Sequence, residues 1–302
     1  MNRIKEELSK IQRTQLKNGD ELRLLYVSKF VNKTTGFRSF NINGNEAINL
    51  LESIDPLEEL AYERAFLAYM TVPKLPVVIY NIVEKVEVFR ARTHFDDIFF
   101  NDIKDISLAP HDAITKFARC NRPYQSRFYG ASNRRTAYME LANYWADEKA
   151  VDEHLFVTIG RWLVKKPFSA LVISTPDPEN RISEYDKIHG AAIDELINKQ
   201  QGEEREATIL MYRYLFNKFR KPAKKDLLTY IITTAYCNVA LSTIPNPDAI
   251  DAIFYPSVPY GGKGVNFAFN NRFVRNDNIE LLDALGDEFK VYISEENKKS
   301  FQ

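Results

Sequence analysis

The sequence predicts a mixed α+β fold, in which strand-like segments stand at both ends of a central stretch and helices are inserted between them. Three observations support this prediction. Residues 1–75 repeat leucines and aromatics at helical steps, residues 77–92 are rich in β-branched and aromatic residues, and three helical patterns follow residue 176. The chain has 302 residues, of which 45% are hydrophobic, so it can bury a substantial core.

The first 75 residues are expected to form a helical N-terminal extension. Its three helical patterns are "IKEELSKIQ", "NEAINLLESI" and "PLEELAYERAFLAYM". After Pro73 and Pro76 the pattern changes to "VVIYNIVEKVEVFRAR", in which Val86 and Val88 alternate with other residues as in a strand. This change divides the chain into residues 1–75 and 76–302, and it places Arg90 near a strand end.

The next stretch, residues 93–129, loses regularity and accumulates His, Asp, Asn, Pro and Arg. Compact domains seldom keep so long an irregular segment without a functional reason, so this stretch is a candidate binding wall. A helix is then expected over residues 133–145, followed by the strand-like runs "HLFVTIGRWLV" and "FSALVIS".

A helical insertion is expected around residues 176–246, with helical patterns over residues 183–200, 205–220 and 226–244. Two strand-like runs, "AIFYPSV" and "VNFAFN", follow it on either side of a glycine-rich loop. The chain is expected to close with a short helix, "IELLDALG", and a strand, "EFKVYIS".

Charge and cysteine content limit the classes of partner. The chain has 41 basic and 41 acidic residues, so no global positive field draws it to nucleic acid or an anionic membrane. Its two cysteines form no CxxC or Cys/His cluster, which suggests neither a disulfide framework nor a zinc site. The charged N-terminus and the lack of a long apolar run favour a soluble, cytoplasmic protein.

Glu140 is the most informative single residue. The predicted helix places it beside Ala137 and Leu141 on the apolar face, and no basic residue stands three or four positions away to form a local ion pair. A solvated glutamate at the boundary of the core is the alternative, and helix geometry alone leaves both interpretations open.

Arg90 and Arg92 point to the same side of the predicted strand, where guanidinium groups suit bidentate binding of phosphate or carboxylate. Alone, the pair is more typical of a protected edge strand. The glycines of "SVPYGGKGVN" indicate a flexible loop and match no phosphate-binding motif. His94, Asp96 and Asp97 could suggest a metal site, but a polar loop is the better interpretation, and no metal is expected.

Taken in order, these segments resemble the RES domain, a family whose pattern combines an early arginine, a central "GR.N..G...Y.A.s...A..E" block and a late "pS...G.N" segment. The resemblance spans about residues 86–270, and Ala118, Cys120 and the long insertion depart from the pattern. The matching residues are Arg90, Arg119, Asn121, Tyr129, Ala131, Ser132, Ala137, Glu140, Ser257, Gly262 or Gly264, and Asn266.

The resemblance implies an ADP-ribosyltransferase-like fold with a split β-sheet, and it implies that residues 76–302 form a catalytic domain that uses NAD as substrate. Several members of the family are NAD-degrading toxins, so the implied partner is an antitoxin from a neighbouring gene. Glu140 would stabilise the positive charge that develops on the ribose, and Tyr129 would pack on the nicotinamide or ribose. Arg90 is implied as the third catalytic residue, placed at the pyrophosphate together with Arg119. The implied cofactor-binding residues are Arg119, Ser257, Asn266 and Arg92.

Three functions remain open at this point. The first is cleavage of the nicotinamide–ribose bond by water or phosphate. The second is transfer of ADP-ribose to a protein or nucleic acid. The third is a binding or regulatory role on the same fold, with the cleft closed by the N-terminal extension and the insertion.

Overall fold

The computed structural model describes residues 44–72, 77–94, 99–145, 150–222, 226–243, 250–293, 295 and 299–301. The first predicted helix, "IKEELSKIQ", lies outside the described residues, as do Asp96 and Asp97 of the candidate metal cluster. Within the described part, the predicted mixed α+β composition is confirmed, and the sheet is mostly antiparallel.

The described strands form one sheet in the order β1-β5-β6-β7-β3-β2-β4-β8-β9. Neighbouring strands pair antiparallel, except that β5 and β6 are parallel. The strands are β1 Ile79–Ile82, β2 Val86–His94, β3 Arg127–Ala131, β4 His154–Val164, β5 Phe168–Val172, β6 Ala252–Pro256, β7 Val265–Asn270, β8 Ile279–Ile293 and β9 Lys299–Phe301.

A seam divides this sheet between β2 and β3. These two strands share a single register pair, Phe89 with Ala131, whereas β2 pairs with β4 along its whole length and all of β3 pairs with β7. Gly130 permits the close approach at the seam, since a Cβ at this position would lie 2.2 Å from Cγ1 of Val88. The two strands therefore pair only at the C-terminal end of β3.

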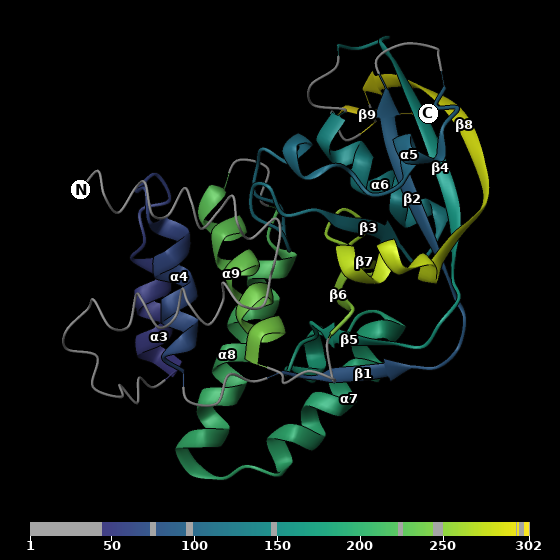
Figure 1. Cartoon of the computed structure of the whole chain (residues 1–302). Coiled ribbons are helices and arrows are strands. Elements are labelled where there is room, and N and C mark those ends of the chain that lie inside the picture. Colours follow the sequence, from purple (N-terminus) through teal and green to yellow (C-terminus); the bar gives the residue numbers. More distant parts are fainter. Residues whose placement is uncertain are drawn as a thin grey trace.

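Helices cover the half of the sheet that contains β5, β6 and β7. Helices α8 and α9 pack on one face, and α3 and α4 pack on them from outside (Figure 1). Helix α7 packs on the other face, where its Ile193 and Ile197 meet Phe254 of β6. The helices are α3 Gly44–Glu52, α4 Ala61–Met70, α5 Ile103–Ile106, α6 Arg134–Trp145, α7 Glu184–Asn198, α8 Gly202–Arg220, α9 Leu227–Thr243 and α10 Asn271–Phe273.

The described part of the N-terminal extension shares a hydrophobic core with the insertion. Leu51 of α3 is fully buried in one cluster with Met211 and Leu215 of α8. In the same cluster the Tyr69 ring of α4 meets the Tyr236 ring of α9 edge-on, with centroids 5.6 Å apart. Burial of these side chains joins α3 and α4 to α8 and α9.

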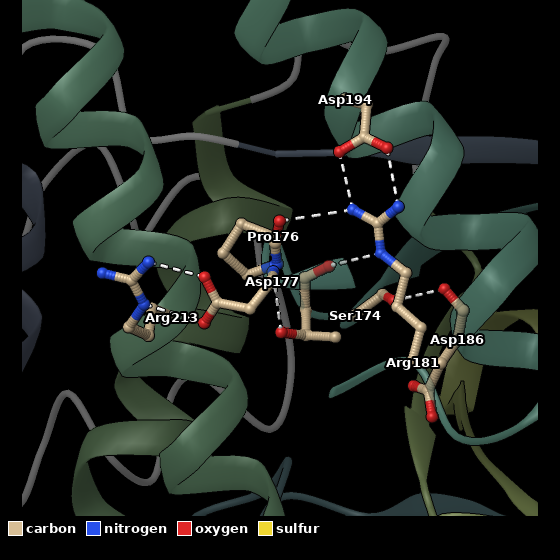
Figure 2. A network of polar contacts seen from close by, with 8 residues as sticks. Ser174, Pro176, Asp177, Arg181, Asp186, Asp194 and Arg213 are labelled. Atoms are coloured by element: carbon tan, nitrogen blue, oxygen red, sulfur yellow. Dashed lines mark hydrogen bonds and ion pairs between the residues drawn. The ribbon is translucent and has the colours of Figure 1, made fainter. Parts of the chain in front are cut away.

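A polar network fixes the start of the insertion, between β5 and α8 (Figure 2). Arg181 donates two hydrogen bonds to the Asp194 carboxylate of α7, both at 2.6 Å. Arg213 of α8 donates two to Asp177, at 2.8 and 2.5 Å. These paired contacts hold the segment after β5 against both helices, because a planar guanidinium matches a carboxylate in one geometry.

The structure corrects several sequence predictions. Residues 279–286 are not a helix but the first half of β8, which pairs with β4 from Ile279 opposite Val164 to Lys290 opposite His154. The leucines of "IELLDALG" have helical spacing, but pairing with β4 outweighs this local preference. The stretch 93–129 is also more regular than predicted, since it contains the end of β2, α5, a 3₁₀ turn at His111–Ala113 and the start of β3.

Arg90 is likewise not near a strand end. It lies inside β2, opposite Gly160 of β4, and β2 is flanked by β3 and β4, so the edge-strand interpretation of Arg90 and Arg92 is wrong. Among the described residues, no group of His, Cys, Asp and Glu is arranged to hold a metal ion, and His94 is packed among phenylalanine rings. No helix in the described ranges has the length and apolar character needed to cross a membrane.

Candidate functional site

The position of Glu140 is set by α6, which begins soon after β3 ends. Asn133 caps the helix, with its Oδ1 accepting a hydrogen bond from the Thr136 backbone N–H at 2.8 Å. The loop between β6 and β7 packs on the same turn, since a Cβ at Gly264 would lie 2.2 Å from Oγ1 of Thr136. The glycine therefore brings the late segment of the chain against the start of α6.

Two side chains that are distant in sequence, Ser257 directly after β6 and Asn266 in β7, hold the Glu140 carboxylate. Its Oε1 accepts hydrogen bonds from Ser257 Oγ at 2.7 Å and from Asn266 Nδ2 at 2.6 Å. Both donors are almost fully buried, at 0% and 4% exposure. Glu140 itself is half-buried, and its carboxylate is held by the late segment that follows the insertion, so the interpretation as a freely solvated side chain is wrong.

Burial controls the charge of Glu140. It raises the pKa of the carboxyl above its usual range, while the hydrogen bonds from Asn266 and Ser257 and the positive charge of Arg119 act in the opposite direction. These donors and this cation favour the ionised form in a site that otherwise disfavours charge.

A cleft of about 300 Å³ opens at the seam of the sheet, and Glu140 lies in its lining. Residues 89–91 of β2 and 129–131 of β3 form its base, and Asn266 of β7 lines it beside Glu140. The seam between β2 and β3 thus forms the base of the cleft, and α6 supplies its carboxylate. Four sequence-predicted residues, Arg90, Arg119, Tyr129 and Asn266, line the same cleft as Glu140, and Ser257 touches Glu140 directly.

Arg90 is fixed in the base of the cleft. Its Nε donates to the Ile106 carbonyl at 3.0 Å, its Nη1 donates to the Tyr129 carbonyl at 2.8 Å, and its guanidinium lies 5.1 Å from the Phe128 ring centroid. Burial, together with repulsion from Arg92, lowers the pKa of Arg90 to about 10. Arg90 is therefore a fixed cation at neutral pH.

Arg92 is a neighbour of Arg90 but does not share its place in the cleft lining. Its Nη1 donates to the Asp105 carbonyl, and its guanidinium is 5.3 Å from the Phe100 ring centroid. It is not among the residues that line the cleft. Arg90 and Arg92 lie on the same side of β2 because side chains alternate between the two faces of a strand. Their guanidinium groups nevertheless bind different backbone carbonyls of the segment around α5.

Tyr129 is held by its hydroxyl. This group donates to Asn121 Oδ1 at 2.7 Å and accepts from the Cys120 backbone N–H at 3.0 Å, and burial raises the pKa of Tyr129 well above its usual value. The hydroxyl thus stays protonated, and the ring is presented to the cleft in a fixed position. Cys120, and Cys237 near it, are free and buried thiols.

Arg119 joins the cleft to the insertion. Its Nη1 donates to the Lys218 carbonyl at 2.8 Å and its Nη2 donates to the Lys221 carbonyl, both at the C-terminal end of α8. Its guanidinium lies 5.7 Å from the centroid of the Tyr230 ring in the first turn of α9. Cationic donors suit the carbonyl end of a helix, so this contact stabilises the position of α8 beside the cleft.

The sequence interpretation missed the residues that the insertion and the late loop add to the cleft. Pro222 and Tyr230 come from the insertion, and Tyr255, Val258 and Pro259 come from β6 and the loop after it. Tyr255 lies in the predicted strand "AIFYPSV", but no spacing signal distinguishes a cleft-lining aromatic from a core aromatic.

Comparison with known proteins adds a likeness to solved structures. No family model matches the chain, and no curated protein matches it. The chain is similar to one in the solved crystal structure of the M. tuberculosis MbcT–MbcA toxin–antitoxin complex, with a TM-score of 0.38 and 12% identity over 68% of this chain and 86% of that one. A likeness this weak carries no argument about the site.

Proposed function

We propose that this protein is an NAD-consuming enzyme that cleaves the bond between nicotinamide and ribose. The observation that carries the proposal is the Glu140 carboxylate, which is held by Ser257 and Asn266 in a cleft at the seam of the sheet. The residues of this chain that match the RES pattern converge on this cleft. The resemblance therefore supports NAD as the substrate.

The chemistry of the reaction matches this carboxylate. When the N-glycosidic bond breaks, its electron pair goes to the nicotinamide nitrogen, which leaves neutral, and positive charge develops on the ribose. An ionised Glu140 beside the ribose stabilises that charge and accepts the proton of the attacking group. Attack by water gives ADP-ribose, and attack by inorganic phosphate gives ADP-ribose 1″-phosphate. No metal is needed, because nicotinamide is already positively charged in NAD and leaves as a neutral molecule.

The cationic and aromatic residues have complementary roles in this proposal. Arg90 supplies a fixed positive charge for the pyrophosphate, and the Tyr129 ring packs against the nicotinamide or its ribose. Arg119 adds positive charge near Glu140. The split sheet agrees with the ADP-ribosyltransferase-like architecture that the resemblance implies.

A toxin role completes the proposal, with an antitoxin from a neighbouring gene as partner. This part rests on the sequence resemblance alone. Its test is growth after induced expression, where arrest by the wild-type chain and normal growth with Glu140→Gln would support it, and equal growth with both would contradict it.

The central experiment incubates the purified full chain with NAD, with and without inorganic phosphate, and separates the products by chromatography. Glu140→Gln keeps an oxygen that accepts both hydrogen bonds but removes the charge, so we expect nicotinamide release to fall by at least about 100-fold. Glu63→Gln is the matched control, because Glu63 is also buried but lies on α4, outside the cleft lining.

Each outcome has a distinct meaning. Release that depends on Glu140 supports the proposal, and the product identifies the acceptor as water or phosphate. Labelled ADP-ribose on a macromolecule in lysate would instead identify a transferase. Unchanged release by Glu140→Gln would contradict the role of the carboxylate, and no NAD binding by the folded chain would contradict the proposal as a whole.

A further inference from the structure

We infer that the inserted helices α8 and α9 supply a recognition wall for an aromatic heterocycle of the bound nucleotide, with Tyr230 as the contact residue and Arg119 as the residue that positions the wall. We define the α8–α9 wall as Pro222 and Tyr230, the two insertion residues that line the cleft. The inference rests on the proposed function and extends it to how this chain selects its substrate.

The α8–α9 wall is part of the same cleft as the reacting group. Tyr230 and Pro222 line it together with Glu140, and the Arg119 charge that acts on the Glu140 pKa lies over the Tyr230 ring. A partly buried aromatic ring in a cleft lining is a surface on which a flat heterocycle can stack. Tyr230 therefore places an aromatic ring in the same cleft as the carboxylate.

Arg119 fixes the wall from the cleft side. Because both terminal nitrogens of Arg119 donate to the Lys218 and Lys221 carbonyls, its guanidinium ties the end of α8 to the segment that leads into β3. The contacts of Arg119 therefore position the wall, and its charge also acts near Glu140.

The wall is also held from the insertion side. Asp226 caps α9, accepting hydrogen bonds from the Thr229 backbone N–H at 3.0 Å and from Thr229 Oγ1 at 2.9 Å. Within α8, the Arg213–Asp177 pair ties the helix to the segment after β5 (Figure 2). Tyr230 thus belongs to a rigid element, as a recognition residue requires.

The chemistry recognised is a flat aromatic heterocycle, which both ends of NAD carry. Stacking of a base on an aromatic side chain stabilises binding enough that its loss weakens affinity roughly tenfold to a hundredfold. We expect Tyr230→Ala to raise the KM for NAD by this factor with a smaller effect on kcat, because stacking contributes to substrate binding rather than to stabilising the charge that develops on the ribose. Tyr230→Phe, which keeps the ring, should restore most of the lost affinity.

Calorimetry on the full chain identifies the end of NAD that stacks. In the Glu140→Gln background, which prevents turnover, NAD, nicotinamide mononucleotide and AMP are each titrated with and without Tyr230→Ala. Loss of affinity for the mononucleotide alone would assign the wall to nicotinamide, and loss for AMP alone would assign it to adenine. Tyr292→Ala, which removes an exposed tyrosine of β8, is the matched control.

A double variant tests the positioning role of Arg119. If Arg119 acts through the wall, Arg119→Ala combined with Tyr230→Ala should raise KM little more than Tyr230→Ala alone, whereas independent roles would multiply. Arg161→Ala, which removes an exposed arginine of β4, is the control for loss of a guanidinium group. Thermal melts establish that each variant is folded.

The outcomes separate this inference from the proposed function. A parent that binds NAD, with Tyr230→Ala binding equally tightly, would overturn the inference and leave the proposed function standing. A folded parent that binds no NAD would overturn both. Multiplicative effects in the double variant would overturn the positioning role of Arg119 alone.

Discussion

Glu140 sits in a position where two opposing effects act on one carboxyl group. Burial disfavours its charge, and the donors Ser257 and Asn266 favour it. The donors are neutral, so they orient the carboxylate without cancelling its charge, which a salt-bridged arginine would do. A carboxylate that is oriented but not neutralised is suited to stabilise a cation that forms beside it.

The raised pKa of Glu140 predicts how stability depends on pH. Because the folded state binds this proton more tightly than the unfolded state, the neutral carboxyl stabilises the fold at low pH, and that contribution is lost as pH rises through the raised pKa. Glu140→Gln carries no such charge. We therefore expect the variant to exceed the wild type in free energy of unfolding at neutral pH.

Urea denaturation from pH 3.5 to 8 measures this difference. It should shrink as pH falls through the raised pKa and disappear in acid, where both side chains are neutral. A wild type that is more stable than Glu140→Gln at neutral pH would show that the hydrogen bonds outweigh burial. This test needs no substrate, so it examines the site independently of the proposed reaction.

At the scale of elements, α6 depends on its cap. Asn133 ends the turn after β3 and accepts hydrogen bonds from both the backbone N–H and the Oγ1 of Thr136. We expect Asn133→Ala to lower the free energy of unfolding by about 1 kcal/mol, because two donors at the start of the helix lose their acceptor. Asn133→Ser, which can still cap, should lose less.

The same change tests how α6 presents Glu140. If fraying of the first turn displaces the carboxylate, nicotinamide release by Asn133→Ala should fall more than stability alone explains, and Asn133→Ser should recover it. Wild-type activity of Asn133→Ala would mean that Ser257 and Asn266 hold Glu140 without help from the cap. Chemical denaturation and initial rates on the same samples provide both measurements.

The elements also show what the sequence can predict. Helix α6 has a capping residue and a continuous helical pattern, so the predicted range 133–145 differs from the observed Arg134–Trp145 by one residue. The prediction of a helix at the start of β8 was wrong because the helical spacing of its leucines is a local signal, whereas pairing with β4 is a long-range interaction. Tyr230 was missed for a related reason, since contact with Arg119 joins residues 111 positions apart in sequence (230 − 119 = 111).

At the scale of the whole molecule, the insertion and the extension form one layered unit. Helices α8 and α9 contact the sheet on one side and α3 and α4 on the other (Figure 1). The cleft residue Tyr230 and the core residue Tyr236 both belong to α9. Packing outside the cleft therefore supports the position of a residue that lines it.

This arrangement predicts that α3 does not unfold separately from the sheet. Leu51 is fully buried between α3 and α8, so Leu51→Ala should lower the free energy of unfolding by about 2–5 kcal/mol through lost burial and the cavity that remains. Far-UV circular dichroism follows the helices, and tryptophan fluorescence includes Trp162, which is buried in β4 against Phe128. Both signals should shift to the same lower denaturant midpoint, because one core joins the layers.

Leu57→Ala is the matched control, since Leu57 is 84% exposed and its loss should change stability by less than about 0.5 kcal/mol. Two separate transitions, with only the helical signal shifted by Leu51→Ala, would instead show that residues 1–75 fold as an independent unit.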